Sequence, residues 1–145
     1  MELLLAVHIT AGVFALAGAA LALSCEKGNQ LHRLSGATYF WAMLAMWVLA
    51  VIYFFTHNYR YIILAAFGFI ALAIGYQDYI RYKNTIAVGK RRIAGHLTRM
   101  LGGTIAVITA VLIVSVNVEP VWILWILPTV IIAPTIIWWN IKTLG

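Results

Sequence analysis

Long runs of apolar residues occupy almost the whole chain, and the charged residues fall in the gaps between them. The runs cover residues 3–23, 34–56, 61–80, 97–118 and 121–141. Each run has about 20 residues, which as a helix matches a hydrocarbon core of about 30 Å. The runs lack the alternation of barrel strands, and lipid cannot satisfy the backbone amides of any open structure. The pattern therefore predicts an all-α integral membrane protein, a single five-helix transmembrane bundle over residues 1–145.

The composition agrees with this prediction. Hydrophobic residues make up 64% of the chain and charged residues 10%, whereas soluble domains have about 25% charged residues. With 145 residues, five such helices leave no room for a separate soluble domain.

The positive charges are distributed unevenly among the connections between the runs. Most lie in the segment 81–99, with smaller groups at 27–33 and in the carboxyl-terminal tail. Every second connection is therefore basic, and the positive-inside rule predicts an outside amino terminus and a cytoplasmic carboxyl terminus. We also expect the segment 81–99 to attract anionic lipid. Because topology explains the net charge of +6, we expect no nucleic-acid partner.

The fifth run is bulkier than the others. It contains four tryptophans, together with Pro128 and Pro134. Proline frees backbone groups that lipid cannot satisfy, and a neighbouring helix can satisfy them. Together with the aromatic residues of the second run, this feature favours a homodimer.

Five ionisable residues are expected near the cytoplasmic ends of the helices. Asp78 continues a stripe of small residues through Gly75, so it should point into the bundle. A charge in the hydrocarbon costs about 2.5–3.5 kcal/mol unless it is paired, so a cationic partner for Asp78 is expected. The cluster is either a proton, anion or headgroup site or a structural ion-pair cluster that sets helix register. Its predicted members are His32, Arg33, Asp78, His96 and Arg99.

The opposite end has a smaller polar set, a secondary outer site of His8 and His57. His8 has apolar neighbours and lies on the small-residue face of the first run. For His8 we favour a hydrogen bond to another helix, and for His57 simple solvation.

Histidines in a helical membrane protein also raise the possibility of b-type haem, which such proteins hold between histidines on facing helices. The alternative hypothesis is one haem with His32 and His96 as ligands. His32 and His57 are 25 residues apart, about 37 Å along a helix, which places two haems too far apart for direct transfer. Metal-site spacings such as HxxxH or CxxC are absent, and Cys25 is the only cysteine. We predict no metal site, no resident cofactor and no catalytic residue.

Several short motifs occur in order along the chain. They are His8 with Gly12, HRLSG at 32–36, HLTRMLGG at 96–103, WILPT at 125–129 and Ala133-Pro134. Taken together, they resemble a family of predicted bacterial polytopic membrane proteins of unknown function. The resemblance implies a multi-pass protein of the bacterial inner membrane and singles out no substrate or chemistry.

These observations favour a non-enzymatic membrane protein, either a transport component or an assembly partner, that works through the cytoplasmic polar cluster. The haem-binding redox protein is the alternative. An enzyme acting on lipid headgroups has no motif in the sequence to support it.

Overall fold

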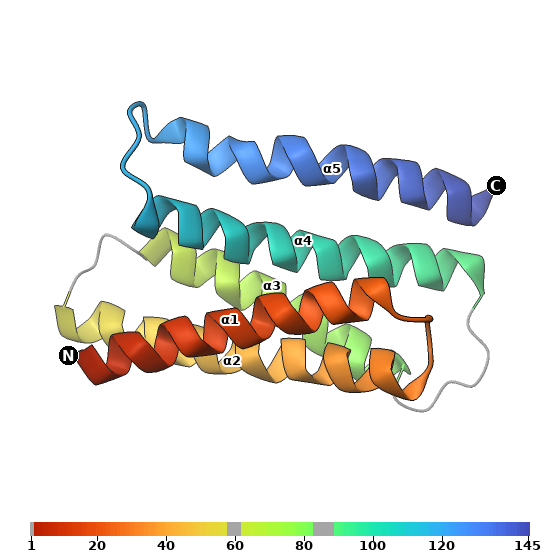
Figure 1. Cartoon of the computed structure of the whole chain (residues 1–145), viewed down its shortest axis with the longest axis horizontal. Helices are drawn as coiled ribbons and strands as arrows, with labels where there is room; N and C mark the ends of the chain where they lie inside the picture. Colours follow the sequence, from red (N-terminus) through yellow and green to blue (C-terminus); the bar gives the residue numbers. More distant parts are fainter. Residues whose placement is uncertain (1, 58–61, 83–88) are drawn as a thin grey trace. The chain divides into compact units, whose positions relative to one another are not determined.

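The computed structural model describes residues 2–57, 62–82 and 89–145, and over these residues the chain forms five α-helices and no strand (Figure 1). The all-helical class predicted from the sequence is confirmed. In chain order the helices are α1 (Glu2–Ser24), α2 (Gln30–His57), α3 (Ile62–Tyr82), α4 (Lys90–Ser115) and α5 (Trp122–Leu144).

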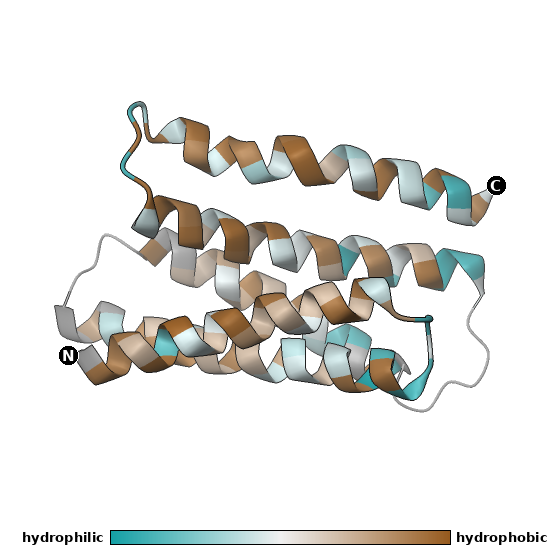
Figure 2. Ribbon diagram, viewed as in Figure 1, coloured by the Kyte–Doolittle hydropathy of each residue, from teal (hydrophilic) through white to brown (hydrophobic). Residues whose placement is uncertain are grey.

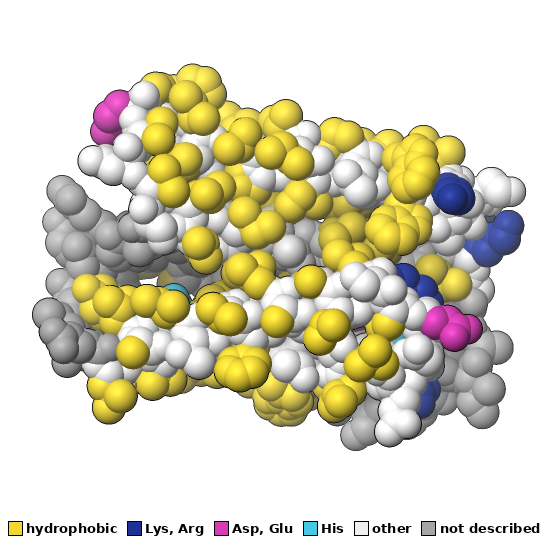
Figure 3. All heavy atoms as spheres, viewed as in Figure 1, with side chains coloured by type: hydrophobic (Ala, Val, Ile, Leu, Met, Phe, Trp, Pro, Cys, Tyr) yellow, Lys and Arg dark blue, Asp and Glu magenta, His cyan; other side chains and the backbone are white. Residues whose placement is uncertain are grey.

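Four of these helices are long and apolar enough to cross a membrane. The candidate spans within the described residues are Leu3–Ser24, Gln30–Tyr53, Lys90–Ile113 and Trp122–Leu144. Figure 2 shows hydrophobic residues along the lengths of these helices and hydrophilic ones mainly toward their ends. Large hydrophobic side chains also cover much of the visible surface in Figure 3. The chain is therefore compatible with a multi-pass membrane protein, whereas a fifth crossing by α3 and the orientation stay predictions.

Two helices begin several residues before their apolar runs. α2 begins at Gln30 rather than residue 34, and α4 begins at Lys90 rather than residue 97. An apolar run marks only the part of a helix that suits lipid. The helix itself extends beyond the run for as long as its backbone hydrogen bonds continue. At α2, the Asn29 side-chain oxygen accepts the backbone N–H of His32 at 2.7 Å and caps the first turn. α4 ends earlier than predicted, because Val116 has extended backbone.

The chain divides into two compact units, Met1–Leu72, here called unit 1, and Ala73–Gly145, called unit 2. Unit 1 contains α1, α2 and the start of α3, while unit 2 contains the end of α3, α4 and α5. The single bundle over the whole chain stays a prediction.

In unit 1, α1 and α2 pack side by side as an antiparallel hairpin (Figure 1). The two backbones come close at Gly18, where an added Cβ would lie 2.9 Å from the Ser35 carbonyl oxygen and from the Tyr39 nitrogen. Only glycine allows the two backbones to come this close. Ala15, which is fully buried, continues this contact along α1. Trp47 connects α2 to α3, because its indole N–H donates to the Ala65 carbonyl at 2.8 Å.

In unit 2, α4 and α5 pack against each other. The buried apolar residues of these two helices include Leu101, Val107, Leu124 and Ile136. α5 is one helix through both Pro128 and Pro134, and Pro128 is buried. The prolines therefore interrupt hydrogen bonds within α5 without ending it.

Candidate functional site

Asp78, near the end of α3, is the most completely buried charged residue among those the structure describes. Its side chain is 1% exposed, as its position on the small-residue stripe predicts. Its Oδ1 lies 2.7 Å from Arg99 Nε, and its Oδ2 lies 3.3 Å from His96 Nδ1. Each carboxylate oxygen thus has its own partner on α4, and the expected cationic pairing of Asp78 is confirmed.

The α4 helix places the two partners on the same face. His96 and Arg99 are three residues apart, which is close to one helical turn. The Arg99 side chain lies over the backbone of Gly95, where an added Cβ would be 3.2 Å from both terminal guanidinium nitrogens. Gly95 therefore leaves the room in which the guanidinium can turn toward Asp78.

Exposure increases from the carboxylate to its partners. The side chain of Asp78 is 1% exposed, whereas those of His96 and Arg99 are 34% and 30% exposed. The two partners are therefore partly exposed while the carboxylate that they contact is not. These three residues, Asp78, His96 and Arg99, are called the unit 2 cluster below.

A second polar link connects α4 to α5. The Asn140 amide donates to the Thr98 hydroxyl at 2.7 Å, and that hydroxyl donates to the Ala94 carbonyl at 2.9 Å. The Asn140 Oδ1 atom is buried and has no hydrogen-bond donor among the described residues. Sequence reasoning missed this pair. The available signal was a threonine and an asparagine near the charged ends of two helices. Polar residues are common at such positions, so the sequence did not single out this pair.

The other two predicted members of the polar cluster lie in unit 1. His32 contacts the end of α1, where its Nδ1 donates to the Ala22 carbonyl at 3.0 Å. The Lys27 ammonium donates to the same oxygen at 2.9 Å. Arg33 is exposed at the start of α2. That His32 and Arg33 join Asp78 in a single cluster stays a prediction.

Of the two histidines in the predicted outer site, the structure describes the side chain of only His8. His8 on α1 donates from Nδ1 to the Met46 carbonyl on α2 at 3.0 Å, which confirms the favoured hydrogen bond between helices. The side chain of His57 lies outside the described residues. The secondary outer site of His8 and His57 stays a prediction.

The described residues contain no group of three or more metal-ligating side chains. A scan against protein-family models and searches of curated proteins and of solved structures found no match. The resemblance to a bacterial membrane family therefore stays a prediction.

Proposed function

We propose that this chain is a small non-enzymatic transport component of the bacterial inner membrane that takes up an anion together with a proton at the unit 2 cluster. The observation that carries this proposal is the Asp78 carboxylate, 1% exposed and held at 2.7 Å by Arg99 Nε. A buried ion pair is weak evidence of a stabilising role, because apolar side chains of similar volume often stabilise a protein equally well. Charged residues inside a membrane are rare and mark ion and proton pathways in many proteins, so such a residue is a candidate functional site by default.

The chemistry follows from the balance of charge. Arg99 is always cationic, and Asp78 neutralises it in the arrangement described here. An anion that binds Arg99 in place of Asp78 leaves the carboxylate unpaired, and a proton on Asp78 removes that charge. Uptake of a monovalent anion is thereby coupled to uptake of one proton. His96 Nδ1, at 3.3 Å from the carboxylate, is positioned to transfer this proton between Asp78 and the surface.

The proposed topology has five crossings, with the amino terminus outside and the carboxyl terminus in the cytoplasm. α3 has 21 residues, or about 31 Å of helix, enough to cross the hydrocarbon core. α4 begins with the exposed residues Lys90, Arg91 and Arg92 after Gly89, which provides no side-chain cap. Three cations at the positive end of a helix dipole are unfavourable by themselves, and anionic headgroups would offset this.

The topology is tested by fusing alkaline phosphatase, which is active only outside the cytoplasm, to the carboxyl terminus. The proposal expects an inactive fusion. Periplasmic activity would mean that the number of crossings or the orientation is different. We also propose a homodimer through α5, which is tested by measuring the mass of the particle in lipid discs over a range of concentrations.

The transport proposal is tested with the full chain in liposomes that contain a pH-sensitive dye. Chloride, nitrate, phosphate and a dicarboxylate are added outside, one at a time. For at least one anion, the interior should acidify faster than in protein-free liposomes, and Asp78→Asn and Arg99→Gln should abolish the difference. Arg91→Gln, which changes an exposed arginine of the same helix, is the matched control. Absence of anion-dependent proton flux with all four anions contradicts the proposal.

One observation favours the haem alternative. In both His32 and His96, Nδ1 has a partner within the chain, the Ala22 carbonyl and the Asp78 carboxylate. Metal-bound histidines typically donate their second ring nitrogen in this way. If the chain is a haem-binding redox protein, we expect the purified chain to show a Soret band, and we expect this band to be absent from the His32→Ala and His96→Ala variants. A colourless preparation from haem-supplemented cells excludes this alternative.

A further inference from the structure

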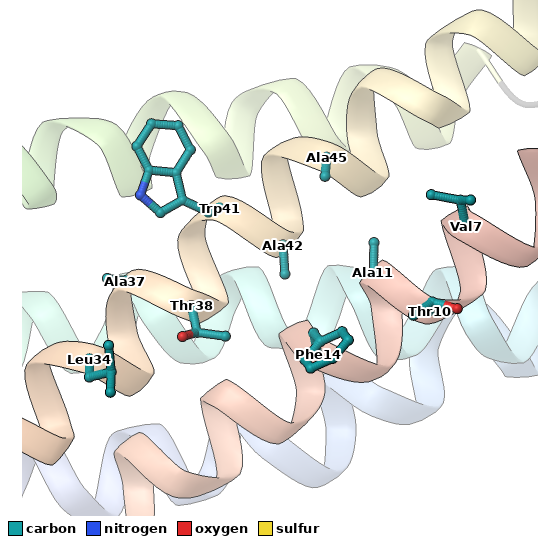
Figure 4. A pocket seen from close by; sticks show the side chains of 10 residues that line it. All are labelled: Val7, Thr10, Ala11, Phe14, Leu34, Ala37, Thr38, Trp41, Ala42 and Ala45. Carbon is teal, nitrogen blue, oxygen red and sulfur yellow. The ribbon is translucent and has the colours of Figure 1, made fainter.

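Unit 1 has an apolar groove between α1 and α2 (Figure 4). None of the residues that line it belongs to the unit 2 cluster. The groove has a volume of about 630 Å³ and is lined by residues of α1 and α2 alone. Small side chains form its floor: in Figure 4, Ala42 and Ala45 point from α2 toward α1, and Ala11 points back from α1. Larger side chains, Phe14 and Trp41 among them, border it.

The groove has about the length of one leaflet of a bilayer. On α2 it extends from Leu34 to Ala45, which is about 16 Å of helix. Half of a hydrocarbon core is about 15 Å thick. The Leu34 end lies near the start of the candidate span Gln30–Tyr53, and the groove continues past its middle. It is thus placed where an acyl chain from one leaflet extends from the interface toward the bilayer centre.

The lining of the groove suits a hydrocarbon chain. Its polar groups are the hydroxyls of Thr10 and Thr38 and the indole N–H of Trp41. The Thr10 hydroxyl already donates to the Ala6 carbonyl of its own helix at 2.8 Å. An apolar occupant therefore leaves this hydroxyl satisfied.

The groove is cationic at its Leu34 end. Arg33 adjoins Leu34 and stands one helical turn before Ala37, another lining residue. Its side chain is exposed, and the described residues provide no ion-pair partner for it. Lys27 in the adjoining turn caps α1 through the Ala22 and Leu23 carbonyls, and Glu26 is the only acidic residue there. One cation is therefore available at the level where a headgroup would lie.

From this combination we infer that the groove binds one anionic phospholipid, with an acyl chain along α1 and α2 and its phosphate at Arg33. The lining residues and Arg33 belong to unit 1, whereas the basic segment 81–99 belongs to unit 2. The specificity of the site comes from the shape of the groove together with a single cation, so it distinguishes an anionic from a zwitterionic headgroup on the same acyl chains.

The test is native mass spectrometry of the full chain, released from detergent after titration with dioleoyl phosphatidylglycerol or dioleoyl phosphatidylcholine. We expect one phosphatidylglycerol molecule to be retained in preference to phosphatidylcholine. Arg33→Gln should weaken retention of phosphatidylglycerol about fivefold, the factor expected for one surface cation. Lys142→Gln, which removes an exposed cation outside both the groove and the segment 81–99, is the control for a general loss of positive charge and should leave retention unchanged.

A second variant fills the groove. Ala45→Phe places a ring on its floor and should abolish retention of either lipid. Ala20→Phe adds the same ring at an exposed position of α1 on the face opposite the groove and should leave retention unchanged. Far-UV circular dichroism confirms that each variant is folded. Equal retention of the two lipids, or unchanged retention in both Arg33→Gln and Ala45→Phe, overturns the inference.

Discussion

The two units connect their helices by different kinds of interaction. In unit 1 the links between α1 and α2 use backbone carbonyls: His8 donates to Met46 and His32 donates to Ala22, on either side of the close contact at Gly18. In unit 2 the link between α3 and α4 is a carboxylate held by a guanidinium and an imidazole. The first kind of link holds two helices against each other. The second kind does this too, and its charged pair can also be broken by a ligand that binds the guanidinium or by a proton that binds the carboxylate.

The energies of the two kinds of link differ as well. A hydrogen bond between membrane helices contributes about 0.6 kcal/mol on average. Removing one partner of a buried ion pair costs about 3–5 kcal/mol, because the other charge is left uncompensated. The variants below test this difference, and they are ordered from the largest expected change in the free energy of unfolding to the smallest.

Arg99→Met should have the largest effect on stability. It leaves the Asp78 carboxylate with only His96, and we expect the free energy of unfolding to fall by about 3 kcal/mol, the lower end of the range, because Arg99 is partly exposed. Adding Asp78→Asn to Arg99→Met should restore most of this loss. The measurement is unfolding in mixed micelles, followed by circular dichroism. Equal losses in the single and double variants would show that Arg99 acts through packing and not through its charge.

Gly18→Ala should have the next largest effect. Its Cβ would lie 2.9 Å from backbone atoms of Ser35 and Tyr39, which cannot move without separating α1 from α2. We expect a loss of about 1–3 kcal/mol, typical of overpacking. Gly36→Ala is the matched control, because nothing lies within 4 Å of its added Cβ. Equal stabilities of the two variants in the same unfolding experiment would mean that the hairpin tolerates a wider spacing.

His8→Leu should lower the free energy of unfolding by only about 0.6 kcal/mol. The change removes the donor to the Met46 carbonyl, which also accepts within α2 as part of a regular helix. Its anion-dependent proton flux in liposomes should equal that of the unchanged chain. A loss of stability as large as that of Arg99→Met would mean that the hydrogen bonds in unit 1 and the ion pair in unit 2 contribute equally to stability.

Gly95→Ala should change stability least. Alanine in place of glycine stabilises a helix by about 0.5–1 kcal/mol, and Gly102→Ala, with nothing within 4 Å of its Cβ, should show this full gain. Gly95→Ala should gain less, because its Cβ would lie 3.2 Å from both terminal nitrogens of Arg99. It should also alter the anion dependence of the proton flux. Identical behaviour of the two variants in both assays would show that the guanidinium moves aside freely.

Some of the site follows from the sequence because it depends on local spacing. The stripe through Gly75 and Asp78 placed the carboxylate inward, and the spacing of His96 and Arg99 placed both partners on one face of α4. The cost of an unpaired charge in hydrocarbon then required a cation nearby. Which cation it is depends on the rotation and register of two helices, and no pattern within one helix specifies that.

The sequence by itself determined the helical class and the approximate position of each helix, because lipid leaves the backbone no other way to bond and because hydropathy records which residues suit lipid. Only the tertiary structure decided that His32 donates to the end of α1, that Gly18 faces the α2 backbone whereas Gly12 faces a side chain, and that Asn140 contacts Thr98. These are contacts between residues far apart along the chain. They depend on how far one helix is shifted along its neighbour, and that shift is set by side-chain shape and backbone approach across an interface that a linear pattern does not record.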